Sequence, residues 1–255
     1  MLKNCVLLTM SALTTEDTLR EGAPEMIRYM LENDCRFFIL TENSSRSAEE
    51  IAHHLRNQGL QGITSDHIYT STMAAAERIM LKDSKHNRAN YIGGSGIREV
   101  LYNLNFKIDE DADWVFVGSD RNSTYSDYSG ILKSILGGAR IIATDLTRLE
   151  YTRNGVYPGP GAIVKMLEHA SGTKAVMMCF PSPLFITQAM WKLNALAEDT
   201  IFISDQLERE ILCAQKCHVT TAYIAGDNDE AGDLFDQEIH PDLVIQDLRA
   251  FTDRR

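Results

Sequence analysis

Two kinds of hydrophobic pattern alternate along the chain. Compact apolar runs rich in β-branched and aromatic residues are typical of buried strands, and they include residues 36–40, 90–92, 114–118, 141–143, 176–179, 201–203 and 221–224. Between them, apolar residues recur every three or four positions, as in amphipathic helices, at residues 72–81, 128–136 and 162–170. This alternation predicts an α/β fold with a mostly parallel sheet, because parallel strands are joined through crossover helices.

Two polar stretches interrupt the alternation, at residues 82–88 and 171–173. Between them the strand and helix pattern starts again. We therefore expect a core domain made of residues 1–82 and 173–255, whose strands form one sheet that includes 176–179. Residues 83–172 are expected to form an inserted α/β cap domain.

The first strand begins at Cys5 and breaks into small polar residues, with Thr9 and Ser11 at its end. The second strand likewise ends in Thr41, Glu42 and Asn43. Ligands of open α/β sheets bind at the carboxyl ends of the strands. The sequence therefore predicts a ligand site at these residues.

Two further motifs each have a structural and a functional interpretation. The glycine-rich segment 93–96 precedes a helix and could cradle a phosphate, but such a segment is more often only a turn. The pair Asp120-Arg121 could contact a ligand, but a structural ion pair is the more common role. We favour the structural interpretation of both.

Charge and composition exclude some partners. The formal net charge is −11, which argues against nucleic acid or an anionic membrane as the main partner. The apolar runs are shorter than the roughly 20 residues that span a bilayer, and the first strand follows the N-terminus directly, so we expect a cytoplasmic protein. Of the five cysteines, Cys179 is of interest for a reactive thiol, although buried free thiols are the default.

Six segments together resemble the haloacid dehalogenase-like superfamily, in the NagD-like (p-nitrophenyl phosphatase) branch. They are 40–45, 117–121 with 124–125, 138–144, 158–162, 181–183 and 203–211. The resemblance spans nearly the whole chain. It implies a Rossmann-like core with an inserted α/β cap, Mg²⁺-dependent hydrolysis of phosphate esters, and a homodimer that forms through the cap.

The catalytic positions of this family carry other residues here. The family's aspartate nucleophile falls on Thr9, its acid/base aspartate on Ser11, and its phosphate-binding lysine on Phe180. A threonine hydroxyl is a poor nucleophile without an adjacent base, and serine does not exchange protons near neutral pH. Phenylalanine removes the positive charge that would face a phosphate. The sequence thus predicts no intact catalytic residue.

The remaining family positions are only partly kept. Thr41 could donate a hydrogen bond to an anion, whereas Glu42, where this branch usually has asparagine, would repel one. Asp205 and Glu210 occupy positions of the family's metal-binding acids. Because position 9 lacks a carboxylate, we expect Mg²⁺ to bind weakly or not at all.

Three functions follow from these expectations. The first is a catalytically impaired member that binds a small molecule, phosphorylated or not, or a protein. The second is a weak Mg²⁺-dependent phosphate monoester hydrolase in which Asp205 and Glu210 hold a metal-bound water. The third is a structural or dimerisation role for the cap, and all three exclude nucleic acid and membrane partners.

Overall fold

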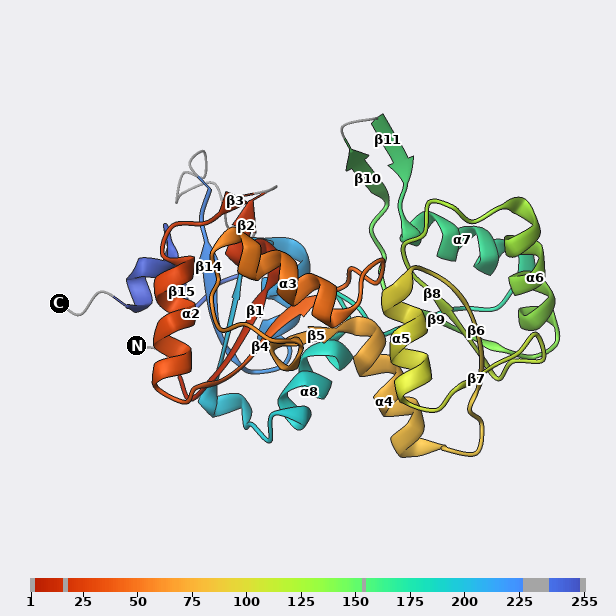
Figure 1. Ribbon diagram of the computed structural model, residues 1–255, viewed down its shortest axis with the longest axis horizontal. Coiled ribbons are helices and arrows are strands. Elements are labelled where there is room, and N and C mark those ends of the chain that lie inside the picture. The colour runs from red at the N-terminus through yellow and green to blue at the C-terminus, as the bar shows by residue number, and fades with distance from the viewer. Residues whose placement is uncertain (1–2, 16–17, 153–154, 227–238, 253–255) are drawn as a thin grey trace. The chain divides into compact units, whose positions relative to one another are not determined.

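The computed structural model describes residues 3–15, 18–152, 155–226 and 239–252. The chain divides into two compact units. Unit 1 comprises Met1–Thr41, Ala48–Tyr69 and Ile186–Arg255, and unit 2 comprises Glu42–Ser47 and Thr70–Phe185. Each unit contains a parallel sheet with helices (Figure 1), so the predicted mostly parallel α/β fold is confirmed.

The sheet of unit 1 has six strands in the order β15-β14-β13-β1-β4-β5. Their bounds are β1 (Cys5–Thr9), β4 (Arg36–Thr41), β5 (Ile68–Thr70), β13 (Thr200–Ser204), β14 (Thr220–Ile224) and β15 (Leu243–Ile245). β1 lies between β4 and β13, parallel to both, and every residue of β1 is buried. Its continuous apolar run is what a strand covered on both faces requires.

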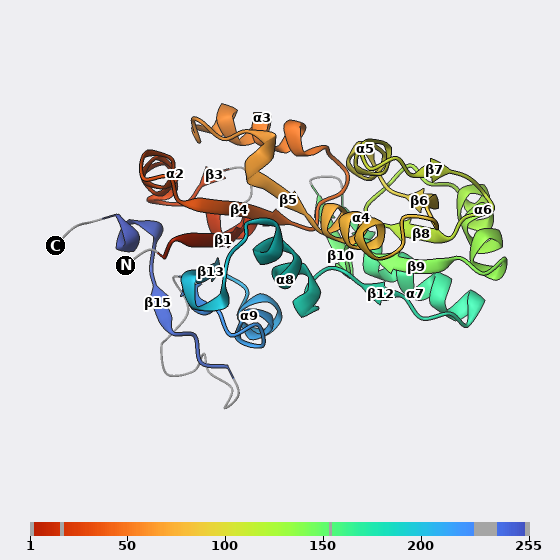
Figure 2. The ribbon, with the colours of Figure 1, turned by 90° about the horizontal axis from the view of Figure 1, so that it is seen from below.

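Helices cover both faces of this sheet. Figure 2 shows α2 (Ala23–Glu32) and α3 (Ala48–Gln58) on one face, and α9 (Leu212–Gln215) and α8 (Pro183–Lys192) on the other. Two short elements follow β1: the four-residue helix α1 (Met10–Leu13) and an antiparallel hairpin of β2 (Thr14–Thr15) and β3 (Thr18–Leu19). The short helical turns of unit 1 are η1 (Ser65–His67), η2 (Ala197–Asp199), η3 (Leu207–Ile211) and η4 (Leu248–Phe251).

Unit 2 is built on a second parallel sheet, of order β12-β9-β8-β6-β7. Its strands are β6 (Arg88–Ile92), β7 (Lys107–Ile108), β8 (Trp114–Val117), β9 (Arg140–Ala143) and β12 (Val176–Met177). Its helices are α4 (Ser71–Lys82), α5 (Ser95–Asn103), α6 (Tyr125–Leu136) and α7 (Pro160–Ser171). An antiparallel hairpin of β10 (Leu149–Thr152) and β11 (Gly155–Pro158) completes the unit. Apolar residues of β6, β8, β9, α6 and α7 form one buried cluster.

The assignment of residues 176–179 to the core sheet was wrong. Val176 and Met177 pair with Ile142 and Ala143 of β9, in the sheet of unit 2. The loop before them is tied to α7, because the Ala175 N–H donates to Glu168 Oε1 at 2.9 Å. Because the connection from α7 to β12 is short, β12 pairs with β9 in the sheet of unit 2.

The compact units also differ from the domain limits expected at 82/83 and 172/173. Residues 70–82, which include α4, and residues 173–185 lie in unit 2. The polar stretch 82–88 is therefore a connection between α4 and β6 inside that unit. Within the described residues, no helix combines the length and the apolar character needed to cross a bilayer.

Candidate functional site

Three neighbouring strands of unit 1 end in polar residues. Thr9 ends β1, Thr41 ends β4, and Ser204 ends β13, directly before Asp205. The register pairs Thr9 with Leu40 and Leu8 with Ile203, so all three ends lie at the same edge of the sheet. The structure thus brings Thr9, Thr41 and Asp205 to adjacent strand ends, as the sequence predicts.

The hydroxyl groups of Thr9 and Ser11 lie in contact, with 3.1 Å between Thr9 Oγ1 and Ser11 Oγ. Thr9 is only 3% exposed, because the chain turns directly from β1 into α1. At the positions of the family's nucleophile and acid/base groups, the structure therefore has two neutral hydroxyls that bind to each other. Neither carries a charge at neutral pH.

The buried carboxyl group of Glu210 is also held by hydroxyls. Ser204 Oγ donates to Glu210 Oε2 at 2.6 Å, and Ser204 Oγ accepts from the Gln206 N–H at 2.9 Å. The π-helical turn η3 directs Glu210 back to the end of β13. Burial raises the pKa of Glu210 above its ordinary value, although hydrogen bonds from Ser204 and Thr9 act in the opposite direction.

Asp205, the other predicted metal ligand, forms an ion pair with Arg20. Arg20 Nη2 lies 2.5 Å from Asp205 Oδ2, and Arg20 Nε donates to the Ser11 carbonyl oxygen at 2.8 Å. Both side chains are largely covered, with exposures of 22% for Arg20 and 16% for Asp205. The guanidinium therefore links the residues that follow β1 to the residue that follows β13.

These residues do not fit the Mg²⁺ that the family implies. Mg²⁺ binds to several oxygen ligands with a strong carboxylate share. Here position 9 is a hydroxyl, Asp205 is paired with a cation, and Glu210 is buried against Ser204. In the described part of the chain, no cluster of three or more His, Cys, Asp or Glu side chains is arranged to hold a metal ion.

The predicted ligand residues after β4 have structural partners. Thr41 belongs to unit 1, whereas Glu42 and Asn43 belong to unit 2. Glu42 Oε1 accepts the Phe180 N–H at 2.7 Å, and Asn43 Oδ1 accepts the N–H and hydroxyl of Ser45. Glu42 and Asn43 thus fix the local backbone, and their contact with a ligand stays a prediction.

Phe180 is a core residue of unit 2. Its side chain is 1% exposed and packs against Phe185 with 5.2 Å between the ring centroids. The neighbouring Cys179 is fully buried in the apolar cluster of this unit, which does not favour a reactive thiol. The family positions that fall on Thr9 and Phe180 imply that the two residues lie in one site; since they belong to different units, this stays a prediction.

The glycine-rich segment 93–96 allows two pieces of backbone to approach each other. A Cβ on Gly94 would collide with the carbonyl oxygen of Ser45, and one on Gly96 with that of Arg46. The glycines therefore let the start of α5 lie directly against the loop 44–46. This close approach supports the turn interpretation over a phosphate cradle.

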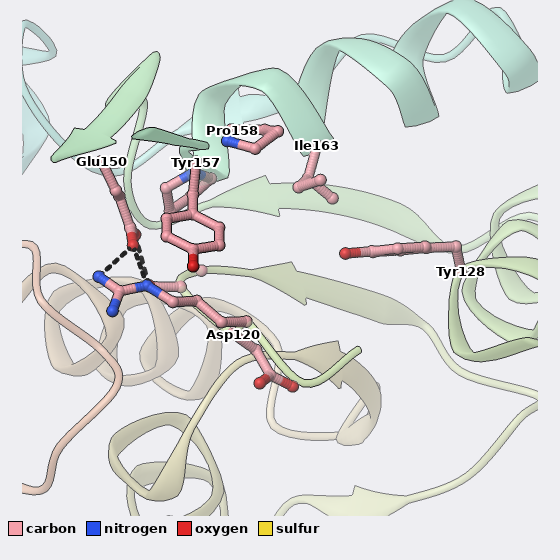
Figure 3. A pocket seen from close by; sticks show the side chains of 10 residues that line it. Asp120, Tyr128, Glu150, Tyr157, Pro158 and Ile163 are labelled. Carbon is pink, nitrogen blue, oxygen red and sulfur yellow. Dashed lines mark hydrogen bonds and ion pairs between the residues drawn. The ribbon is translucent and has the colours of Figure 1, made fainter. Parts of the chain in front are cut away.

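Unit 2 also contains a small pocket beside the β10–β11 hairpin, with a volume of about 120 Å³. Figure 3 shows Glu150 and Tyr157 from the hairpin, with Tyr128 and Ile163 across the pocket from them. Glu150 accepts from Arg121 Nε at 2.8 Å and from Ser119 Oγ at 2.6 Å. Arg121 thus forms its ion pair with Glu150 and not with Asp120, whose carboxylate accepts from the Asn122 N–H and the Ser123 hydroxyl.

Two charged residues of these sites were missed from the sequence, Arg20 and Glu150. Both lie on or next to a short hairpin, β2–β3 for Arg20 and β10–β11 for Glu150. Arg20 is 185 positions from Asp205 in the chain, and Glu150 is 29 positions from Arg121. The available signal for Arg20 was the loss of a carboxylate at position 9. Without the metal ion that both acids would bind in the family, Asp205 needs another cation.

Two family models match the chain. One, described as haloacid dehalogenase-like hydrolase, matches residues 11–107, and the other, of HAD-hydrolase-like proteins, matches residues 180–251. Among curated relatives, the acid sugar phosphatase of Staphylococcus saprophyticus is 26% identical over 230 residues, which cover 89% of this chain and 88% of the relative. The ribonucleotide monophosphatase NagD of Escherichia coli K12 is 25% identical over 244 residues, which cover 95% of each chain.

Solved structures show the same fold over nearly the whole chain. NagD from Escherichia coli K-12 superimposes with a TM-score of 0.87 at 24% identity, covering 97% of this chain and 98% of that one. A double mutant of the thermostable p-nitrophenylphosphatase of Geobacillus stearothermophilus has a TM-score of 0.86 at 26% identity, covering 98% of each chain. These similarities extend over both units described here.

Proposed function

The chain belongs to the haloacid dehalogenase-like superfamily, in its NagD-like branch, and from that premise we propose that it is a catalytically impaired member that binds a small molecule. The observation that carries this proposal is the environment of Thr9. At the position of the family's nucleophile, a buried neutral hydroxyl contacts Ser11 and Glu210. In other covalent catalysts, loss of the nucleophile lowers the rate by roughly 10⁴ to 10⁶.

A small phosphorylated compound is the ligand class that we favour. The similar proteins are named as phosphatases of sugars and ribonucleotides, which are small phosphate esters. Ser11 and Thr41 supply hydroxyl groups near adjacent strand ends that can bind phosphate oxygens without splitting the ester. A protein ligand is the alternative, and the experiment below distinguishes the two.

The experiment is a binding assay that does not depend on turnover. Thermal unfolding of the purified chain is measured with a panel of sugar phosphates, nucleoside monophosphates and their unphosphorylated counterparts. A phosphorylated ligand that binds the native state stabilises it by RT ln(1 + L/Kd), where L is the ligand concentration, so the unfolding temperature rises with the logarithm of that concentration once it exceeds the Kd. If no member of either set shifts the transition, a small-molecule role is contradicted and a protein ligand becomes the working hypothesis.

A weak hydrolase is the second candidate, and the contact between Thr9 and Glu210 favours it. A carboxylate whose pKa is raised by burial is a better proton acceptor than an exposed one. Such an enzyme would lose its residual activity in both Thr9→Ala and Glu210→Gln. If it required Mg²⁺ held by Asp205 and Glu210, as the sequence also allows, chelation would abolish the activity as well.

We further propose a homodimer that forms through the cap, residues 83–172. Support comes from large side chains that are exposed on unit 2, including Tyr102, Tyr125, Leu136 and Tyr151. Light scattering at several protein concentrations tests this state, and a monomer at all of them would contradict it. The cytoplasmic location expected from the sequence also stays a proposal, tested by imaging a tagged chain.

A further inference from the structure

The guanidinium of Arg20 binds two oxygen atoms at this edge of the sheet. One is the carboxylate oxygen Oδ2 of Asp205, and the other is the carbonyl oxygen of Ser11. Both are hard oxygen ligands of the kind that Mg²⁺ prefers.

The backbone explains how Arg20 reaches this position. After α1 the chain turns back through the hairpin β2–β3, and the Arg20 N–H donates to the carbonyl oxygen of Leu13 at 2.8 Å. This bond holds the Cα of Arg20 beside the helix that begins after Thr9. The side chain then crosses to Asp205, which directly follows β13, the neighbouring strand of the sheet.

The charges at this end of the sheet balance with Arg20 in place. In the family, a carboxylate at position 9 together with Asp205 would face a doubly charged ion. Here Thr9 is neutral, and Asp205 is the carboxylate that faces Arg20, whose single positive charge matches it. A divalent ion beside Arg20 would instead be repelled, by about 4 kcal/mol for each unit of its charge at 4 Å in an effective dielectric of 20.

From these contacts we propose that Arg20 is a resident organic cation that takes the place of the divalent metal ion and excludes it. The positive charge that faces Asp205 is then supplied by the chain itself. This inference deepens the proposed function and rests on it, since a site without a metal suits binding and not phosphoryl transfer. Among the described residues, two N–H groups of Arg20 make the bonds above, and its other N–H groups can bind an oxyanion such as phosphate.

The test measures Mg²⁺ binding by titration calorimetry in four proteins: the unaltered chain, Thr9→Asp, Thr9→Asp/Arg20→Ala, and Thr9→Asp/Arg56→Ala. Arg56 is the matched control, because it too donates to a carbonyl oxygen, of Ile63, and to a carboxylate, of Glu49, in the same unit. Circular dichroism checks the fold of each variant.

We expect Thr9→Asp/Arg20→Ala to bind Mg²⁺ at least about tenfold more tightly than Thr9→Asp and Thr9→Asp/Arg56→Ala, and the unaltered chain to give no Mg²⁺ heat. In Thr9→Asp, the new carboxylate would pair with Arg20 instead. If Thr9→Asp and its control with Arg56→Ala bind Mg²⁺ as tightly as the variant without Arg20, the inference is wrong. Mg²⁺ binding by the unaltered chain would also overturn it.

If Thr9→Asp/Arg20→Ala does not fold, Thr9→Asp/Arg20→Gln is measured in its place. Glutamine keeps a hydrogen-bond donor for Asp205 without the charge, so Mg²⁺ binding is again expected, and its absence would contradict the inference. Failure of this inference and failure of the proposed function give different results. Efficient turnover in the presence of a chelator would refute catalytic impairment and leave the role of Arg20 intact. Mg²⁺ binding to the unaltered chain without turnover would refute the role of Arg20 and leave catalytic impairment intact.

Discussion

Replacing Phe180 by lysine, the residue that the family has at this position, is expected to lower the stability of unit 2 and to restore no catalytic activity. The Phe180 ring is 1% exposed and packs on Phe185. A buried aromatic side chain removes roughly 150–250 Å² from water, worth about 4–6 kcal/mol at about 25 cal/mol per Å². Measured Phe→Ala substitutions in cores cost about 3–5 kcal/mol. Phe180→Lys adds a buried charge, so its loss should be at least as large.

Urea unfolding followed by tryptophan fluorescence measures this loss. The chain has two tryptophans, Trp114 in unit 2 and the exposed Trp191 in unit 1, so a Trp191→Phe background leaves Trp114 to report on unit 2. Tyr102→Ala is the control, because that aromatic side chain is 80% exposed and should change stability by less than about 0.5 kcal/mol. A Phe180→Lys variant that loses less than about 1 kcal/mol would refute the burial argument.

Three further predictions concern the site and its support. Since the native state favours protonated Glu210, stability should fall as pH rises from the ordinary glutamate value of 4.5 through the raised pKa, and Glu210→Gln should flatten that fall in urea titrations at several pH values. An unchanged slope would contradict this account. Gly96→Ala should cost about 1–3 kcal/mol by collision with Arg46, whereas Gly138→Ala, which has open space but a positive φ, reports backbone strain alone. Restoring the family's nucleophile by Thr9→Asp should give no p-nitrophenyl phosphate hydrolysis while Arg20 is present, and measurable turnover would speak against exclusion of the metal ion by Arg20.

Much of the fold could be predicted because local pattern decides it. The buried runs of β1, β4 and β13 have the continuous apolar character of strands covered on both faces, and their polar ends mark one edge of the sheet. Which sheet a short strand joins is not a local property. Val176–Met177 has the composition of a core strand, yet its short connection to α7 assigns it to β9.

The partners within the site could not be predicted for a similar reason. The bond from Phe180 N to Glu42 joins residues 138 positions apart, and the ion pair of Arg20 with Asp205 joins residues 185 apart. Sequence reasoning identified Glu42 as a repulsive charge and Phe180 as a missing one. It could not show that the Glu42 carboxylate holds the Phe180 backbone, or that an arginine beyond the first hairpin balances Asp205.

Steady-state hydrolysis of p-nitrophenyl phosphate with saturating Mg²⁺, compared between the unaltered chain and Thr9→Ala, tests the central claim of catalytic impairment most directly. The typical enzyme has a kcat of about 10 s⁻¹, and loss of the nucleophile removes at least roughly 10⁴ of it. We therefore predict a kcat of about 10⁻³ s⁻¹ or lower, and the same rate in Thr9→Ala. A kcat near about 10 s⁻¹ that disappears in Thr9→Ala would show that the hydroxyl is the nucleophile of a working enzyme, and would contradict the account.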